Sequence, residues 1–333
     1  MTKYFKLYIL FLFFSITGFS QISKVHYIPP LTNNKSLSGG SSIPLDQYMY
    51  LSTPSENNVT VTITPLNGDS PTTYNNLSNG NPIRYDIGTS WNGTNYTPSQ
   101  LFVDHETTGG NTALNAGFVV EADCPIYVSI RYNAGAQAGA LVSKGDASLG
   151  TNFRAGMMTN GTVQSANAHF TANSFFSVMA TQDNTIVSID LPNALIGETT
   201  LSNYNYQGPF TKVLQKHESM VLSLDFENTN ANNQGARNSL NGALIRSVDE
   251  DGTEDGTKPL VVNVGSASGS FSATGSGHDH GIDQIVGLDR VGHEYIFVRG
   301  NGQNLNDGGQ LETPLIISTK DNTHLYINGS TTA

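Results

Sequence analysis

One nine-residue pattern occurs three times in this chain, and it constrains the fold more than any other feature. The copies are SENNVTVTI at 55–63, TQDNTIVSI at 181–189 and TKDNTHLYI at 319–327. Each copy joins a polar turn to an alternation of apolar and polar residues, which is typical of a half-buried β-strand. Because the copies lie 126 and 138 residues apart, the pattern predicts a tandem array of one β-rich unit.

Three further pairs of segments recur in the same order, which extends the repeat beyond the nine-residue pattern. They are LNAGFVVEAD at 114–123 with LNGALIRSVD at 240–249, CPIYVSI at 124–130 with KPLVVNV at 258–264, and LGTNF at 149–153 with VGHEY at 291–295. The offset between partners grows from 126 to 134 and then to 142 residues. The second copy has therefore gained residues twice, at 250–257 and before Val291. Insertions in repeats fall in loops, which often carry function.

Turn-forming dipeptides occur along the whole chain. Asn-Gly occurs seven times and Asp-Gly three times, and both favour the tight turns that join neighbouring antiparallel strands. Short alternating runs such as Tyr48–Ser52, Phe175–Met179 and Leu260–Val264 lie between the turns, and no stretch shows a sustained helical stripe. The predicted fold class is therefore all-β, with tandem antiparallel β-sandwich-like repeats. A β-propeller is the alternative closure.

The repeats and the composition predict five segments along the chain. These are a signal peptide at 1–20, an N-terminal lead segment at 21–44, a first β-rich repeat unit at 45–170, a second β-rich repeat unit at 171–318 and the start of a third unit at 319–333. Because only 328–333 follow the third nonapeptide, we expect the chain to be a fragment of a longer protein.

The first 20 residues have the organisation of a secretory signal peptide. Two lysines precede the apolar run Leu7–Phe14, and Gly18 and Ser20 place small residues at the third and first positions before a cleavage site at Gln21. This apolar run is short for a membrane span, and no other stretch has the roughly 20 apolar residues that a span needs. We therefore predict a protein that is secreted, or exposed on the cell surface, with no transmembrane segment.

The charge and cysteine content narrow the possible partners. The net charge of −11 and the sequence pI near 5.0 make a nucleic acid partner unexpected, since a phosphate backbone is bound by clustered Lys and Arg. Charged residues make up 13% of the chain, about half of the roughly 25% in an average domain. Cys124 is the only cysteine, so the chain can form no internal disulfide. Its place before an apolar strand predicts a buried thiol.

Several of these segments resemble one known family. The repeated D-N-T turn and strand, the later P-I/L-x-V strand, DHGIDQ at 279–284 and the following V-G-x-E-Y are similar to the IgGFc-binding protein N-terminal domain, over roughly residues 45–327. The resemblance implies an extracellular interaction module of the type found in large secreted proteins of gliding bacteria that use type IX secretion. It implies no residue-level site for immunoglobulin, because a domain-level likeness does not transfer a partner.

An acidic loop at the first insertion matches part of a calcium-binding loop. The matching residues, at loop positions 1, 3, 5, 6 and 9, are Ser247, Asp249, Asp251, Gly252 and Asp255. The carboxylate of position 12 is missing because Lys258 stands there. Calcium is therefore a candidate ligand of Asp249, Asp251 and Asp255, and a solvated acidic hairpin tip is the alternative. No other cofactor is predicted.

The segment GHDHGIDQ at 277–284 brings imidazole and carboxylate groups together. His278 and His280, with Asp279 or Asp283, are ligands of the kinds that zinc accepts. Nothing in the sequence indicates the third and fourth ligands that a zinc site needs. The alternative, which we favour, is a side-chain network that braces this loop.

Three functions are compatible with these features. The first is a non-catalytic secreted or cell-surface interaction or adhesion module that binds protein or glycan partners. The second is a carbohydrate-binding accessory module that uses exposed aromatic pairs, Tyr204 with Tyr206 or Trp91 with Tyr96. The third is a metal-assisted hydrolase. We expect no enzyme, because the sequence contains none of the common catalytic or nucleotide-binding motifs. The oligomeric state is left open.

Overall fold

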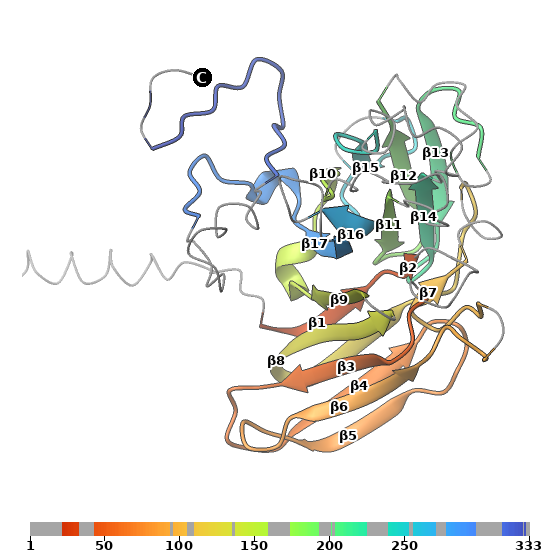
Figure 1. Ribbon diagram of the computed structural model, residues 1–333, viewed down its shortest axis with the longest axis vertical. Helices are drawn as coiled ribbons and strands as arrows, with labels where there is room; N and C mark the ends of the chain where they lie inside the picture. Colours follow the sequence, from red (N-terminus) through yellow and green to blue (C-terminus); the bar gives the residue numbers. More distant parts are fainter. Residues whose placement is uncertain are drawn as a thin grey trace, which may run out of the picture.

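The protein is built from antiparallel sheets, as seen in the computed structural model (Figure 1). The structure describes residues 22–32, 43–93, 96–104, 110–134, 137–158, 174–192, 201, 204–224, 239–252, 256–270, 278–297, 315–328 and 330. Within these ranges the regular elements are β-strands and short 3-10 turns, with no α-helix. The all-β prediction is therefore confirmed.

The first unit is a sandwich whose two layers share one long strand. Its strands are β1 (Ser23–Ile28), β3 (Gln47–Ser52), β4 (Val59–Pro65), β5 (Thr72–Leu77), β6 (Ile83–Gly88), β8 (Phe118–Ala134) and β9 (Gln137–Val142). The first half of β8 pairs with β1 and β4, and its second half pairs with β3 and β9. The layers are therefore β5-β4-β8-β1 and β6-β3-β8-β9, and alternate apolar side chains of both form one core.

The second unit is a sandwich of two four-stranded layers. Its strands are β10 (Asn152–Arg154), β11 (Ser174–Ala180), β12 (Thr185–Asp190), β13 (Phe210–Leu214), β14 (Ser219–Leu224), β15 (Leu244–Val248), β16 (Leu260–Ser270) and β17 (His278–Ile285). One layer has the order β13-β12-β15-β10 and the other β14-β11-β16-β17. Their facing apolar side chains, such as Val178, Val187 and Ile245, form a second core.

The two units have the same strand order, layer by layer. Strands β1, β3, β4, β5, β6 and β9 occupy the places of β10, β11, β12, β13, β14 and β17, and the two halves of β8 occupy the places of β15 and β16. The first two nonapeptides lie in β4 and β12 with the turns that precede them. The sandwich form of the tandem repeat is therefore confirmed, and the propeller alternative is not what forms.

The structure corrects the alignment of one repeated segment by a single residue. Ile63 of β4 pairs with Val120, and its equivalent Ile189 of β12 pairs with Ile245, so this segment repeats at 125 residues rather than 126. The shift brings Gly117 and Gly242 into register, and both have a positive φ, 97° and 89°. A left-handed turn that favours glycine begins each strand, and this requirement is not visible in the apolar pattern.

The strands of the first unit span residues 23–142, and those of the second span 152–285. Strand β1 thus lies in the predicted lead segment 21–44, and β10 lies before the predicted start of the second unit at residue 171. A short 3-10 turn, η1 (Gly145–Ser148), connects the two sets of strands. Two 2-residue strands, β2 (Leu31–Thr32) and β7 (Phe102–Val103), pair in parallel beside them. How the chain divides into independently folding domains stays a prediction.

The third nonapeptide does not form the strand that its pattern predicts. Residues 319–327 make a turn, with Asn322 at φ 57° like Asn184 at φ 53°, and then continue without sheet pairing. Ile327 is 63% exposed, whereas its equivalent Ile189 is fully buried. The reason lies in the topology. The nonapeptide falls in the place of β12. In both units the strands in the places of β10, β11 and β12 pair only with strands that come later in the same unit, so this segment does not pair with the strands before it.

Replacement of the two repeated glycines tests the corrected register. A Cβ on Gly117 would lie 2.2 Å from the carbonyl oxygen of Ile28, whereas a Cβ on Gly242 would meet no atom within 4 Å. We expect Gly242→Ala to lower the free energy of unfolding by about 1 kcal/mol through backbone strain alone. Gly117→Ala adds a backbone clash, so we expect a loss of about 3 kcal/mol. Chemical denaturation measures both, and equal losses would contradict this explanation.

Candidate functional site

The segment DHGIDQ lies on β17, where the second unit meets the first. Strand β17 pairs with β16 in an antiparallel register that places Gln284 opposite Asn263 and Asp283 opposite Val264. The other edge of β17 lies beside β9 of the first unit (Figure 1). We call the polar contacts across this boundary the clasp. Its side chains are Asp279, His280, Asp283, Gln284 and Asn263 of the second unit with Tyr132, Ser143 and Lys144 of the first.

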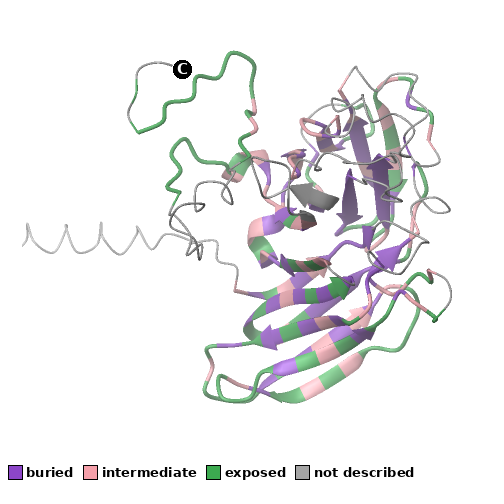
Figure 2. Ribbon diagram, in the orientation of Figure 1, coloured by how far each residue is buried: buried purple, intermediate pink, exposed green. Residues whose placement is uncertain are grey.

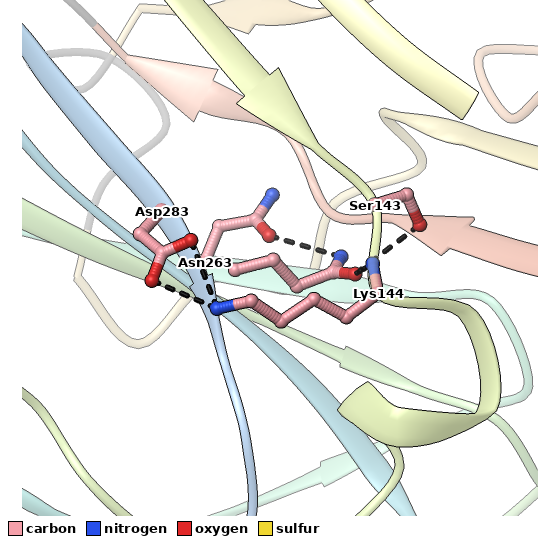
Figure 3. Close-up of polar contacts among 5 residues, drawn as sticks. Ser143, Lys144, Asn263 and Asp283 are labelled. Atoms are coloured by element: carbon pink, nitrogen blue, oxygen red, sulfur yellow. Dashed lines mark hydrogen bonds and ion pairs between the residues drawn. The ribbon is translucent and has the colours of Figure 1, made fainter. Parts of the chain in front are cut away.

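Gln284 is the centre of the clasp and is fully buried. Its Oε1 accepts hydrogen bonds from the backbone N–H of Lys144 at 2.7 Å and the hydroxyl of Ser143 at 3.2 Å. Its Nε2 donates to the carbonyl oxygen of Tyr27 at 2.9 Å. It also donates to Oδ1 of Asn263 at 3.2 Å, as drawn in Figure 3. Both donors and both acceptor positions of this amide are therefore used, three of them by the first unit.

Asn263 continues the network toward the N-terminal strand. It is also fully buried, and its Nδ2 donates to the carbonyl oxygen of Pro29 at 2.9 Å. Two adjacent amide side chains of the second unit thus satisfy backbone groups of the first. A buried polar group is stable only with such partners, so the contact specifies one relative position of the two sheets.

An ion pair lies at the edge of the clasp. Nζ of Lys144 lies 2.9 and 2.8 Å from the two carboxylate oxygens of Asp283 (Figure 3). The side chain of Asp283 is 58% exposed, so water and salt screen this pair. We therefore expect the amide network to stabilise the clasp more than the ion pair does.

Asp279 and His280 extend the clasp along β9 and β8. Asp279 accepts a hydrogen bond from the backbone N–H of Ala138. Nδ1 of the buried His280 lies 3.0 Å from the hydroxyl of Tyr132. Burial lowers the pKa of His280 to about 4 and raises the pKa of Tyr132 well above its ordinary value. At neutral pH the tyrosine hydroxyl therefore donates a hydrogen bond to Nδ1 of the uncharged imidazole. No described residue bonds Nε2 of that ring.

A second buried histidine joins the clasp from β1. Nδ1 of His26 lies 3.0 Å from the hydroxyl of Ser143, and its Nε2 lies 3.0 Å from the carbonyl oxygen of Ile126. Burial lowers the pKa of His26, so the ring is neutral and its Nε2–H faces the carbonyl. The single hydroxyl proton of Ser143 therefore faces two acceptors, Nδ1 of His26 and Oε1 of Gln284. Sequence analysis missed His26, Ser143 and Lys144, because isolated polar residues in a strand and in a short connection form no pattern.

The residues of the proposed zinc site are engaged in other contacts. His280 bonds Tyr132, and Asp279 and Asp283 bond Ala138 and Lys144. The side chain of His278 lies outside the described residues. Among those described, no group of three or more His, Cys, Asp or Glu side chains is placed to hold a metal ion. Zinc binding stays a prediction that this geometry does not favour, and the side-chain network that we favour over it joins two units instead of bracing one loop.

The acidic loop of the proposed calcium site follows β15. Asp249 and Asp251 are exposed there, and Asp255 lies outside the described residues. Lys258, which stands at the twelfth position of the calcium pattern, donates instead to the carbonyl oxygens of Asp183 and Asn184 at 2.9 and 2.8 Å. Calcium binding at this loop stays a prediction.

Two other predictions about side chains are wrong. Cys124 is exposed, because it lies where β8 passes from one layer to the other and its alternation of buried and exposed positions breaks. Tyr206 is buried, with its hydroxyl accepting a hydrogen bond from the backbone N–H of Leu191 at 2.9 Å. It cannot form an exposed sugar-stacking pair with Tyr204, whose ring packs on Phe210 at a centroid distance of 4.7 Å.

Fold and clasp together define a class of protein, a tandem β-sandwich whose units are joined by buried amide and imidazole contacts. A family model described as IgGFc binding protein matches residues 138–333, which is more than half of the chain. The chain therefore belongs to the IgGFc-binding family, whose domains are binding modules of extracellular proteins. Searches of curated proteins and of solved structures find no match. No helix in the described ranges is long and apolar enough to cross a membrane.

Two substitutions separate the buried and exposed parts of the clasp. Gln284→Ala leaves the Lys144 N–H, the Tyr27 carbonyl and Asn263 Oδ1 buried without their partner, so we expect the free energy of unfolding to fall by about 3 kcal/mol or more. Asp283→Asn removes only a screened ion pair and should cost no more than about 1 kcal/mol. Denaturant titrations of the full chain measure both losses. A larger loss in Asp283→Asn would show that the ion pair, and not the amide, dominates.

Acid should weaken the clasp through His280. Its pKa is lowered from 6.5 to about 4, so between these values the unfolded chain binds a proton that the folded chain does not. The free energy of unfolding therefore falls as the pH drops through this window, by up to about 1.4 kcal/mol per pH unit and about 3 kcal/mol in all. His280→Asn keeps an acceptor for Tyr132 and removes this contribution. Denaturation at pH 7 and pH 4.5 should give a smaller difference for the variant, and equal differences would contradict the assignment.

Proposed function

We propose that the protein is a non-catalytic interaction module that binds protein or glycan partners outside the cell. One observation supports this proposal more strongly than the alternative functions. Asp279, His280, Asp283 and Gln284 of the segment DHGIDQ are all bonded across the boundary between two sandwiches. Groups used in this way stabilise an assembly of sheets, which supports a structural role for this segment over proton transfer or metal binding. Membership of the IgGFc-binding family supports the same function.

The proposal includes export through the N-terminal leader at 1–20. Strand β1 begins at Ser23, so cleavage before Gln21 would leave the first unit intact. We further propose that the protein is released or displayed at the cell surface of a gliding bacterium with type IX secretion, as the resemblance implies. The partner and any role in adhesion or gliding motility belong to this proposal.

The two alternatives have less support. For a carbohydrate-binding module, the burial of Tyr206 leaves Trp91 with Tyr96 as the remaining aromatic pair, and these residues form an isolated bridge between chain segments. For a metal-assisted hydrolase, the described residues bring together no set of three metal ligands. The interaction module therefore accounts for the observations with the fewest added features.

One experiment tests export and binding on the same material. The full chain, expressed with its leader, is recovered from the medium, sequenced from its N-terminus and applied to arrays of purified extracellular proteins and of glycans. We expect Gln21 as the first residue and saturable binding to at least one protein. Trp91→Ala is the matched variant, and binding confined to glycans that this change abolishes would favour the carbohydrate module. Retention of the leader, or the absence of saturable binding on both arrays, would contradict the proposal.

A further inference from the structure

The outer face of the layer β6-β3-β8-β9 carries an unusual set of side chains. We call it the Tyr–Arg face, formed by Tyr48, Tyr50, Arg84, Tyr127 and Arg131. Tyr50 is 38% exposed and Tyr127 is 41% exposed, and both arginines are also exposed. The alternate residues of the same strands, such as Met49 and Ile130, are buried in the core, which gives the banded exposure seen along these strands in Figure 2.

The strand register places these side chains on one continuous surface. Tyr50 lies opposite Arg84 on one side, and Tyr48 lies opposite Arg131 on the other. Tyr127 lies opposite Ser52, the next outward residue of β3. Directly opposite residues of antiparallel strands have Cβ atoms about 5 Å apart, so three strands contribute to a single flat patch.

The N–H donors of the two guanidinium groups of this face have no acceptor among the described residues. Arg84 lies over the ring of Tyr48, with its Cζ 4.6 Å from the ring centroid. This cation–π contact uses the face of the guanidinium group and leaves the N–H groups at its edge able to donate hydrogen bonds. Within the described part of the chain, neither Arg84 nor Arg131 forms a hydrogen bond or ion pair. The nearby Asp86 accepts a hydrogen bond from the backbone N–H of Gly88 at 2.9 Å.

Several other cations of the described chain are bound to protein oxygens. Lys144 pairs with Asp283, Lys258 donates to two carbonyl groups, and Arg154 donates to the carbonyl oxygen of Gly242 at 2.8 Å. The Tyr–Arg face thus holds two guanidinium groups whose N–H donors no described residue uses, with the exposed Asp86 opposite Tyr48, in a chain with a net charge of −11.

The equivalent face of the second unit is an interface. Strand β11 holds the place of β3, and all of its residues and those of β14 are buried. Their outward side chains, including Phe175 and Val221, pack in the core cluster of the first unit. A unit of this fold therefore uses this face to contact a protein neighbour. In the first unit the corresponding positions carry Tyr and Arg, which are among the residues most enriched at the hot spots of protein–protein interfaces.

We propose that the Tyr–Arg face is a docking surface for a protein segment rich in Asp and Glu. Guanidinium groups bind carboxylates through two parallel hydrogen bonds, and tyrosine rings supply contact area around them. The rings of Tyr48 and Tyr50 are tilted by 65°, so they do not form the coplanar platform on which sugar rings stack. The inference rests on the proposed function and narrows its partner to acidic protein surfaces.

The test uses fluorescein-labelled poly-L-glutamate as the probe, with heparin and alginate as glycan probes. We expect the full chain to bind poly-L-glutamate with an affinity that falls as salt is raised, because the contact is exposed. Arg84→Gln with Arg131→Gln should weaken binding at least tenfold. Lys216→Gln with Lys320→Gln changes the net charge equally at exposed positions off the face, and should change binding less than twofold. Circular dichroism checks that each variant is folded.

Each other outcome overturns the proposal. Failure of the full chain to bind poly-L-glutamate, or an equal loss in the lysine variant, would show that the face is not a specific site for carboxylates. Preferential binding of heparin or alginate, lost in the arginine variant, would make the face a glycan site. Protein binding on the extracellular array that persists in the arginine variant would overturn the docking surface while leaving the interaction module in place.

Discussion

The relative position of the two sandwiches depends on the burial of one uncharged side chain, Gln284. An amide removed from water without partners costs several kcal/mol, and this one is fully buried. Three of its four hydrogen bonds come from the first unit, through Lys144, Ser143 and Tyr27. Strand β17 is therefore stable beside β9 only in the register that satisfies this amide. The exposed ion pair of Asp283 and the buried His280 lie on the same strand as this amide.

Backbone hydrogen bonding explains why the unit is the whole sandwich and not its first strands. In both copies the strands that come first along the chain pair only with strands from later in the same unit. An early strand thus leaves its backbone groups without partners until the later half has formed. The nonapeptide at 319–327 illustrates the consequence, because a related pattern is a largely buried strand at 185–190 and an exposed segment without sheet pairing here.

The architecture can be predicted from the sequence because strands and repeated units both leave periodic patterns in it. The alternation in each nonapeptide indicates a strand, and its recurrence indicates a duplicated unit, which together specify the tandem sandwich. Two kinds of information are not periodic. The left-handed turns at Gly117 and Gly242 set the strand register through their positive φ. The pattern of apolar residues around them does not indicate this backbone conformation. The partners of DHGIDQ are single residues about 140 positions earlier, such as Ser143 and Tyr132, and only the folded chain brings them together.

The clasp is tested most directly by hydrogen exchange at the backbone amide of Lys144. This N–H lies in a connection between β9 and η1, and its acceptor is Oε1 of Gln284, so its protection reports the contact between units. We predict that it exchanges as slowly as amides at the centre of β8, through global unfolding. Exchange at the rate of an exposed loop, with β8 still protected, would show that the two sandwiches separate freely and would contradict this account.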